Sequence, residues 1–126
     1  MRTTFAAAVS VAAAVAAAPA GAAGDAARGE RLFNQQCKAC HTLEKGGPGT
    51  AGPNLNGLFG RKAGSGGGYP SSEAMKTSGI VWDDTTVAEY LKDPKAKVPG
   101  TKMIFAGFKQ DAQQEDMIAF LRKATQ

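Results

Sequence analysis

The stretch Cys37-Lys38-Ala39-Cys40-His41 decides how this chain is organised. It contains the only two cysteines and the only histidine among the 126 residues. Two thiols about one helical turn apart, followed at once by an imidazole, form the pattern through which a haem is attached covalently. Each thiol can bond one vinyl group of the same porphyrin, and His41 then lies beneath the iron. The spacing therefore predicts one covalently bound haem c, with its iron, per chain.

Cysteines with this spacing also occur in structural disulfides, thiol redox pairs and zinc sites. Neither a disulfide nor a redox pair needs a histidine directly after the second cysteine, and the thioredoxin-like βαβ pattern is absent from the sequence. A zinc site needs a fourth ligand, and the chain has no further cysteine or histidine. The haem interpretation is favoured over the other three.

The composition of the chain changes near its N-terminus. Residues 1–23 contain twelve alanines, one arginine and no acid, whereas all eleven acidic residues lie at Asp25 or later. A positive start, an alanine-rich run and small residues around Pro19 are typical of a cleavable secretory signal peptide. We expect a signal peptide at 1–23, one haem domain at 24–126 and a periplasmic protein. A membrane span is disfavoured because it needs about 20 strongly apolar residues.

The charge of the chain is mildly basic. The formal net charge is +4 at pH 7, and removal of residues 1–23 would leave +3. This excess is too small, and runs of lysine and arginine are too few, for a nucleic-acid partner. An acidic protein surface is the partner that such a charge favours.

Apolar residues at helical spacing predict a first helix that follows the capping residue Asp25 and delivers the cysteines at its end. Leu32 and Phe33 lie on its apolar face. The stretch 46–68 then holds ten of the sixteen glycines and two prolines, which predicts turns rather than regular elements. A loop of this length in a compact domain needs support from another part of the structure, which a bound haem would provide. The haem would also add to a core that is small for a domain of this size.

Two further helices are predicted in the second half of the chain. One is capped by Asp84 and ends before Pro94, and its apolar face is Val87, Tyr90 and Leu91. The other begins with a capping box of Asp111 and Gln114, and its buried stripe is Met117, Ile118, Phe120 and Leu121. No strand pattern of useful length is present. The fold class is therefore all-α, with three main helices, short helices and long loops wrapped around the haem.

A methionine is the candidate for the second axial ligand of the iron. Met117 belongs to a helical apolar stripe, where core packing explains it. Met75 lies in the polar segment 71–78, which offers no rigid setting. Met103 follows the Pro99-Gly100 turn, whose non-helical backbone can present a sulfur to the far face of the haem. Ligation by histidine and methionine raises the reduction potential and leaves no vacancy for a substrate, which favours electron transfer over catalysis.

From residue 24 to its C-terminus the chain resembles the class I cytochromes c of the mitochondrial and small bacterial photosynthetic or respiratory type. The stretches that carry this resemblance are CKACHTLEKGG (37–47), GPNLNGLFGRK (52–62), Ile80 to Trp82, Tyr90-Leu91, PGTKMIFAG (99–107) and EDMIAFLRKAT (115–125). Such agreement is specific to the family and goes beyond the haem-attachment motif. The resemblance implies the class I cytochrome c fold.

The resemblance also implies roles for individual residues. Cys37 and Cys40 would hold the haem, His41 and Met103 would ligate its iron, and the Pro53 carbonyl would accept a hydrogen bond from His41. Tyr90 would hydrogen-bond near the Met103 sulfur. The remaining pocket residues would lie near the haem propionates: Arg61, Tyr69, Ser71, Trp82 and Thr101. Ser71 stands where the family commonly has a tyrosine, so we expect altered solvation of that propionate.

In this family, lysines encircle the exposed haem edge. The corresponding candidates here are Lys38, Lys62, Lys95, Lys97, Lys102 and Lys109. A ring of positive charge speeds encounter with an acidic partner more than it tightens binding. Such kinetics suit a carrier that must leave its partner quickly.

Together these inferences predict a soluble, monomeric, periplasmic one-electron carrier that is neither an enzyme nor embedded in a membrane. Its partners would be acidic redox proteins or membrane complexes: a quinol-oxidising cytochrome complex, a terminal oxidase or a photosynthetic reaction centre. Two other functions stay open if the bond from Met103 to iron is labile, namely a haem peroxidase and a sensor of small gases.

Overall fold

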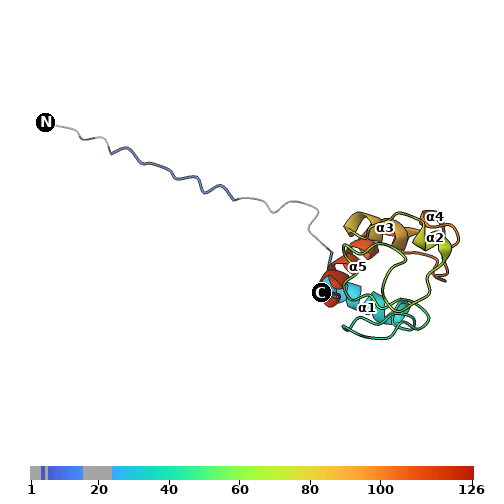
Figure 1. Ribbon diagram of the computed structural model, residues 1–126. Coiled ribbons are helices and arrows are strands. Elements are labelled where there is room, and N and C mark those ends of the chain that lie inside the picture. Colours follow the sequence, from blue (N-terminus) through green and yellow to red (C-terminus); the bar gives the residue numbers. More distant parts are fainter. Residues whose placement is uncertain (1–3, 5, 16–23) are drawn as a thin grey trace.

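The computed structural model describes residues 4, 6–15 and 24–126, and the folded part begins at residue 24 (Figure 1). Residues 4 and 6–15 are exposed and have no regular secondary structure. The expected cleavage region around Pro19 lies outside the described residues, so the signal peptide stays a prediction. Among the residues described, no helix combines the length and the apolar character that a membrane crossing requires.

The described part of the chain contains five helices and no extended strand. They are α1 (Ala26–Gln36), α2 (Glu73–Lys76), α3 (Asp84–Lys92), α4 (Pro94–Lys97) and α5 (Asp111–Ala124). The long helices α1, α3 and α5 match the three predicted ones, and α2 and α4 are short. Between α1 and α2 the chain forms turns and loops, with one isolated bridge between Lys62 and Val81. The all-α class and the turn-rich stretch 46–68 are thereby confirmed.

Aspartates cap both α1 and α3. Asp25 caps α1 as predicted, and its carboxylate accepts from the N–H of Arg28 at 3.0 Å. The cap of α3 is Asp83, so the prediction of Asp84 is wrong by one residue. Asp83 accepts from the N–H of Thr86, and the Thr86 hydroxyl accepts from the N–H of Asp83. Only the first of the two aspartates has a hydroxyl three residues later, and this reciprocal pair selects it.

The predicted capping box of α5 is wrong. Gln110 occupies the cap position and makes no side-chain cap hydrogen bond. Gln114 is buried, and its amide donates to the carbonyl oxygen of Phe108 at 2.8 Å. The Gln114 side chain thus satisfies a buried backbone group of the preceding loop rather than the end of the helix.

The first and last helices, α1 and α5, lie against each other (Figure 1), and Gly29 lies at their contact. A Cβ atom at Gly29 would lie 2.0 Å from the carbonyl oxygen of Asp116 in α5, so this contact needs a glycine. The carboxylate of Asp116 is nearly buried and accepts from the N–H of Asp25 at 2.7 Å and from Nε of Arg28 at 2.9 Å. These contacts join the two ends of the domain.

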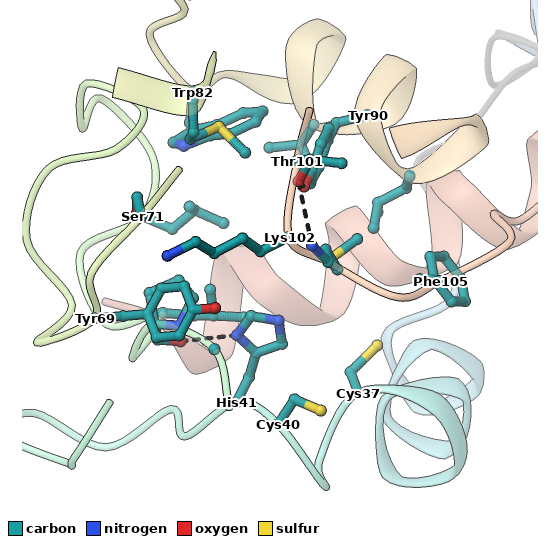
Figure 2. A pocket seen from close by; sticks show the side chains of 18 of the residues that line it. Cys37, Cys40, His41, Tyr69, Ser71, Trp82, Tyr90, Thr101, Lys102 and Phe105 are labelled. Atoms are coloured by element: carbon teal, nitrogen blue, oxygen red, sulfur yellow. Dashed lines mark hydrogen bonds between the residues drawn. The ribbon is translucent and has the colours of Figure 1, made fainter. Parts of the chain in front are cut away.

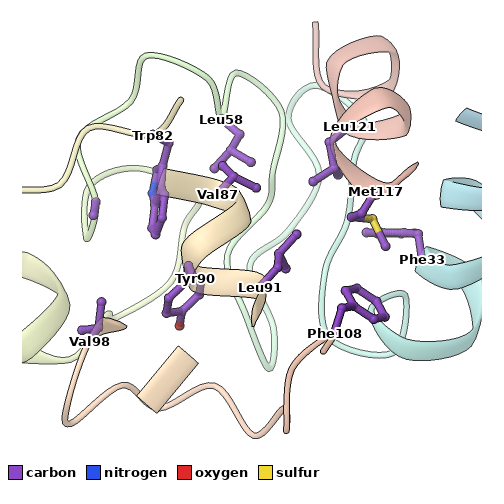
Figure 3. Close-up of a cluster of buried hydrophobic side chains, with 11 residues drawn as sticks. Phe33, Leu58, Trp82, Val87, Tyr90, Leu91, Val98, Phe108, Met117 and Leu121 are labelled. Carbon is purple, nitrogen blue, oxygen red and sulfur yellow. The ribbon is translucent and has the colours of Figure 1, made fainter. Parts of the chain in front are cut away.

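The buried apolar side chains form one cluster (Figure 3). Its members are Phe33, Leu58, Ala63, Trp82, Val87, Tyr90, Leu91, Val98, Phe108, Met117 and Leu121. The predicted apolar face of α3 is confirmed. In α5, Met117 and Leu121 are buried, whereas Ile118 and Phe120 are only partly buried. Met117 is therefore a core residue, as predicted.

Candidate functional site

A cavity of about 270 Å³ gathers residues from distant parts of the chain (Figure 2). Its walls are mainly apolar, with Phe33, Leu55, Leu58 and Phe105 among them. All of the residues that the sequence places at the haem line this one cavity: Cys37, Cys40, His41, Pro53, Arg61, Tyr69, Ser71, Trp82, Tyr90, Thr101 and Met103. Of the six candidate docking lysines, Lys102 alone lines it.

Gly52 and Pro53 hold the imidazole of His41 in one orientation. Its Nδ1 lies 2.7 Å from the carbonyl oxygen of Pro53, and because that oxygen can only accept, Nδ1 carries the proton. A Cβ atom at Gly52 would lie 2.7 Å from Cε1 of the ring, so the glycine allows the backbone to lie against the imidazole. Burial lowers the pKa of His41, and the hydrogen bond to Pro53 offsets this only in part. The neutral ring therefore keeps the lone pair of Nε2 for a metal.

The two cysteines stand where α1 ends. Cys37 is the C-cap of α1, and its N–H donates to the carbonyl of Phe33. The N–H groups of Cys40 and His41 both donate to the carbonyl of Cys37, which folds the motif into a tight turn. Both thiols are free and line the cavity, on the same side as the imidazole (Figure 2). Burial raises the pKa of Cys37 to about 11, and the neighbouring Cys40 adds to the effect.

Met103 reaches the cavity from the loop between α4 and α5. Its N–H donates to Oγ1 of Thr101 at 3.3 Å, and this hydroxyl lies 2.6 Å from the hydroxyl of Tyr90 on α3. Burial raises the pKa of Tyr90, so the phenol stays protonated and can act as a hydrogen-bond donor. Sequence reasoning placed the Tyr90 hydroxyl at the Met103 sulfur, and the structure places it on Thr101. A buried tyrosine thereby orients the backbone at Met103.

Arg61 brings a positive charge to the wall of the cavity. Its guanidinium donates to the carbonyl oxygens of Asn54 at 2.9 Å and Asn56 at 3.2 Å. Burial lowers the pKa of Arg61, and no carboxylate of the described residues lies within ion-pair distance of it. A partly buried guanidinium without a carboxylate partner favours an anionic group in the cavity. The other predicted propionate neighbours line the same cavity: Tyr69, Ser71 and Trp82.

Three residues of the site were missed or misjudged by sequence reasoning. Met75 lies in α2, packs against the core and lines the cavity, so its segment has a defined setting, which the sequence analysis did not expect. The sequence signal for this short helix was Ser72, a capping residue that is followed by the helix formers Glu-Ala-Met-Lys. Ile104 and Phe105 also line the cavity, and Ile104 is 99% exposed. No local sequence pattern distinguishes these two residues as part of the cavity wall.

The donor set fits a haem bound through two thioether bonds. Two thiols, an imidazole with a free Nε2 and a thioether line one apolar cavity, and a guanidinium is present for the acidic groups of the porphyrin. No group of three or more His, Cys, Asp and Glu side chains gathers in residues 24–126 or the other described residues, so a zinc site built from them is not found there. Fold and site together define a small all-α protein with covalently attached haem.

Comparison with known proteins identifies the family. The sequence model described as Cytochrome c matches residues 26–125. The chain is 48% identical over 103 residues to a cytochrome c of Chlamydomonas reinhardtii, covering 82% of this chain and 92% of the relative. It is 50% identical over 102 residues to a cytochrome c of Theileria annulata (81% and 88%) and to a cytochrome c2 of Blastochloris viridis (81% and 80%). The chain belongs to the cytochrome c family, whose members carry electrons on a covalently attached haem c.

Proposed function

We propose that this protein is an exported one-electron carrier in which Cys37 and Cys40 hold the haem and His41 and Met103 ligate its iron. When bound, the haem supplies the one-electron change between ferric and ferrous iron. The proposal rests on one observation: Pro53 holds His41 with Nε2 free, and the loop that carries Met103 lines the same cavity. A thioether ligand favours the ferrous state and so raises the reduction potential. With side chains on both faces, no position is left for oxygen or peroxide, so we propose no catalytic role.

Other cavity residues support this arrangement. Arg61 and Trp82 would stabilise the propionates, whose charge is costly to bury without a partner. Tyr69 and Ser71 line the cavity with them, and a serine hydroxyl is shorter than the tyrosine common in the family, so water would fill the difference. Thr101 would act chiefly through Met103, because its hydroxyl contacts the backbone there.

Spectra and mass test the ligand set. The protein purified from cells that attach haem should carry one haem by mass spectrometry, and the same measurement reports whether residues 1–23 are removed. The Cys37→Ser/Cys40→Ser variant should lose the covalent haem. The ferric protein should show the weak sulfur-to-iron absorption near the red end, and Met103→Ala should abolish it. A five-coordinate, high-spin ferric spectrum in the native protein would refute the carrier and favour a haem peroxidase or a gas sensor.

We also propose a docking surface for acidic redox proteins around Ile104. Lys38, Lys62 and Lys95 are exposed, and no ion pair within the described residues involves them. The other three candidate lysines are engaged by the chain itself: Lys97 with the Glu89 carboxylate, Lys102 with the Pro70 carbonyl and Lys109 with the Lys92 carbonyl. An exposed apolar side chain and exposed, unpaired lysines each suit a transient interface with a membrane respiratory or photosynthetic complex.

Salt dependence tests the docking surface. Electron transfer from an acidic one-electron donor protein should slow as salt is added, because screening weakens steering. Lys95→Glu should lower the rate at low salt more than Lys123→Glu, which makes the same change of charge at the end of α5. A rate that does not respond to salt would exclude charge-steered docking while leaving the ligand assignment intact.

A further inference from the structure

The peptide group between Pro53 and Asn54 makes a hydrogen bond with each of its two polar atoms. Its carbonyl oxygen, on Pro53, accepts from Nδ1 of His41 at 2.7 Å (Figure 2). Its N–H, on Asn54, donates to the carbonyl oxygen of Gly67 at 2.9 Å. The group is planar and trans, so its C=O and N–H point in opposite directions. One rigid unit therefore connects the imidazole to the glycine-rich turn 64–68 on the far side.

The turn lies directly against this peptide group. A Cβ atom at Gly67 would lie 2.6 Å from Cβ of Pro53 and 2.9 Å from the carbonyl oxygen of Asn54. The φ of Gly67 is +71°, in the region that favours glycine. Its carbonyl oxygen also lies against Gly49, where an added Cβ would be 2.4 Å from that oxygen. The turn thus contacts both ends of the loop 49–54, and the glycines allow the backbones to lie so close.

The side chain of Asn54 holds the peptide group in place. Asn54 is 6% exposed, and its side-chain amide donates to Oγ1 of Thr42 at 2.8 Å and to the carbonyl oxygen of Glu44 at 2.9 Å. The N–H of Asn54 is therefore presented to Gly67 in one orientation. Hydrogen bonds in series polarise one another, so an acceptor at the N–H makes the carbonyl oxygen of the same peptide group a stronger acceptor. An acceptor at this N–H thus also strengthens the bond at His41.

We propose that Gly67 is a positioning residue for an axial ligand: through the Pro53–Asn54 peptide group, its carbonyl oxygen aligns and strengthens the hydrogen bond that His41 donates. The proposal rests on the ligand role of His41 proposed above, and it adds that a turn remote from the imidazole tunes this ligand. A stronger hydrogen bond from Nδ1 makes the imidazole a better electron donor, which favours ferric iron. The contact with Gly67 thereby lowers the reduction potential.

Alanine substitutions at three glycines test this contact in the haem-loaded protein. In Gly67→Ala the added Cβ meets the peptide group, so either the turn or the peptide group must move, and both movements weaken the bond at His41. Gly49→Ala displaces the Gly67 carbonyl without strain in φ, because the φ of Gly49 is not positive. Gly46→Ala is the control, since Gly46 has a φ of +78° and no atom within 4 Å of an added Cβ.

The reduction potential and the exchange of the His41 ring N–H, followed by NMR, report on the bond. Gly67→Ala and Gly49→Ala should both shift the potential to more positive values. Exchange of the ring N–H should be about two- to tenfold faster in both, the factor that one net hydrogen bond supplies. Gly46→Ala should match the wild type in both measurements. Gly49→Ala decides the question if Gly67→Ala does not retain its haem.

Three results would overturn the proposal. The first is a wild-type potential in the deciding variant, and the second is an equal shift in Gly46→Ala, because strain in φ alone would then explain it. The third is a loss of stability to denaturant without a shift in potential, which would leave a purely structural role. If His41 is not the ligand, its ring protons in the ferric wild type lack the large paramagnetic shifts that ligation causes. If only the role of Gly67 is wrong, those shifts are present and the potential does not change.

Discussion

Gly29→Ala tests the contact between α1 and α5. The added Cβ would lie 2.0 Å from the carbonyl oxygen of Asp116 and 2.7 Å from Cβ of Phe120. Favourable contacts between heavy atoms are about 3.5 Å long, so α1 must move away by roughly 1 Å or more, because the carbonyl belongs to a helix and cannot turn aside. This shift would also separate the rings of Phe33 and Phe120, whose centroids are 5.5 Å apart.

The expected loss follows from two opposing effects. Alanine is better than glycine inside a helix by about 1 kcal/mol, whereas overpacking costs about 1–3 kcal/mol and sometimes more. Lengthened hydrogen bonds to the nearly buried Asp116 would each add about 1 kcal/mol to the loss. We expect a net loss of roughly 2–4 kcal/mol in the free energy of unfolding.

Guanidinium unfolding of the haem-loaded protein, followed by helical circular dichroism, measures this loss. Glu30→Ala is the control, since Glu30 is exposed in the same helix and its truncation should change stability by about 0.5 kcal/mol at most. A Gly29→Ala protein as stable as the wild type would show that helix propensity outweighs the contact, and the reasoning from close approach would then be refuted.

Other predictions concern single side chains. The hydrogen bond from Arg28 holds the pKa of Asp116 below its usual range, so the stability this group contributes is present above about pH 4 and is lost as the pH falls further, through the lowered pKa. In Asp116→Asn, the free energy of unfolding measured with denaturant should fall less steeply as the pH drops below about 4. An unchanged pH dependence in that range would contradict this. Asp84→Ala should cost less than about 1 kcal/mol by the same method, because its ion pair with Arg122 is solvent-exposed. Phe33 is only 2% exposed, so Phe33→Ala should lower the free energy of unfolding by about 3–5 kcal/mol. A loss below about 1 kcal/mol would mean that the core collapses around the gap.

The site could be predicted from the sequence more completely than the details of the fold. The CxxCH stretch is local in the chain, and its chemistry requires these residue types at this spacing, so it is legible without a structure. The helices were found because their apolar faces repeat at helical spacing. The start of α3 was misplaced by one residue, because Asp83 and Asp84 differ only in what lies three residues later.

The two misjudged residues, Met75 and Gln114, were misjudged for different reasons. Met75 looked loose because its segment is polar, yet α2 packs it against the core. Gln114 looked like half of a capping box, yet its amide is drawn to the buried carbonyl of Phe108. For Gln114, the need to satisfy a buried carbonyl outweighs the local preference for a helix cap. For Met75, the local signal of the Ser72 cap agreed with the fold and was overlooked.

The sequence by itself determined the covalent chemistry, the three main helices and the family, because bond formation and helical periodicity are properties of residues close together in the chain. Only the tertiary structure decided that the Tyr90 hydroxyl lies on Thr101, that the Gln114 amide donates to Phe108, and which lysines are bonded within the chain. Lys102 shows the difference most clearly: as a charge in the sequence it suits docking, and in the fold its ammonium donates to the carbonyl of Pro70. Such choices are made by distances between segments, which become defined only when the chain has packed.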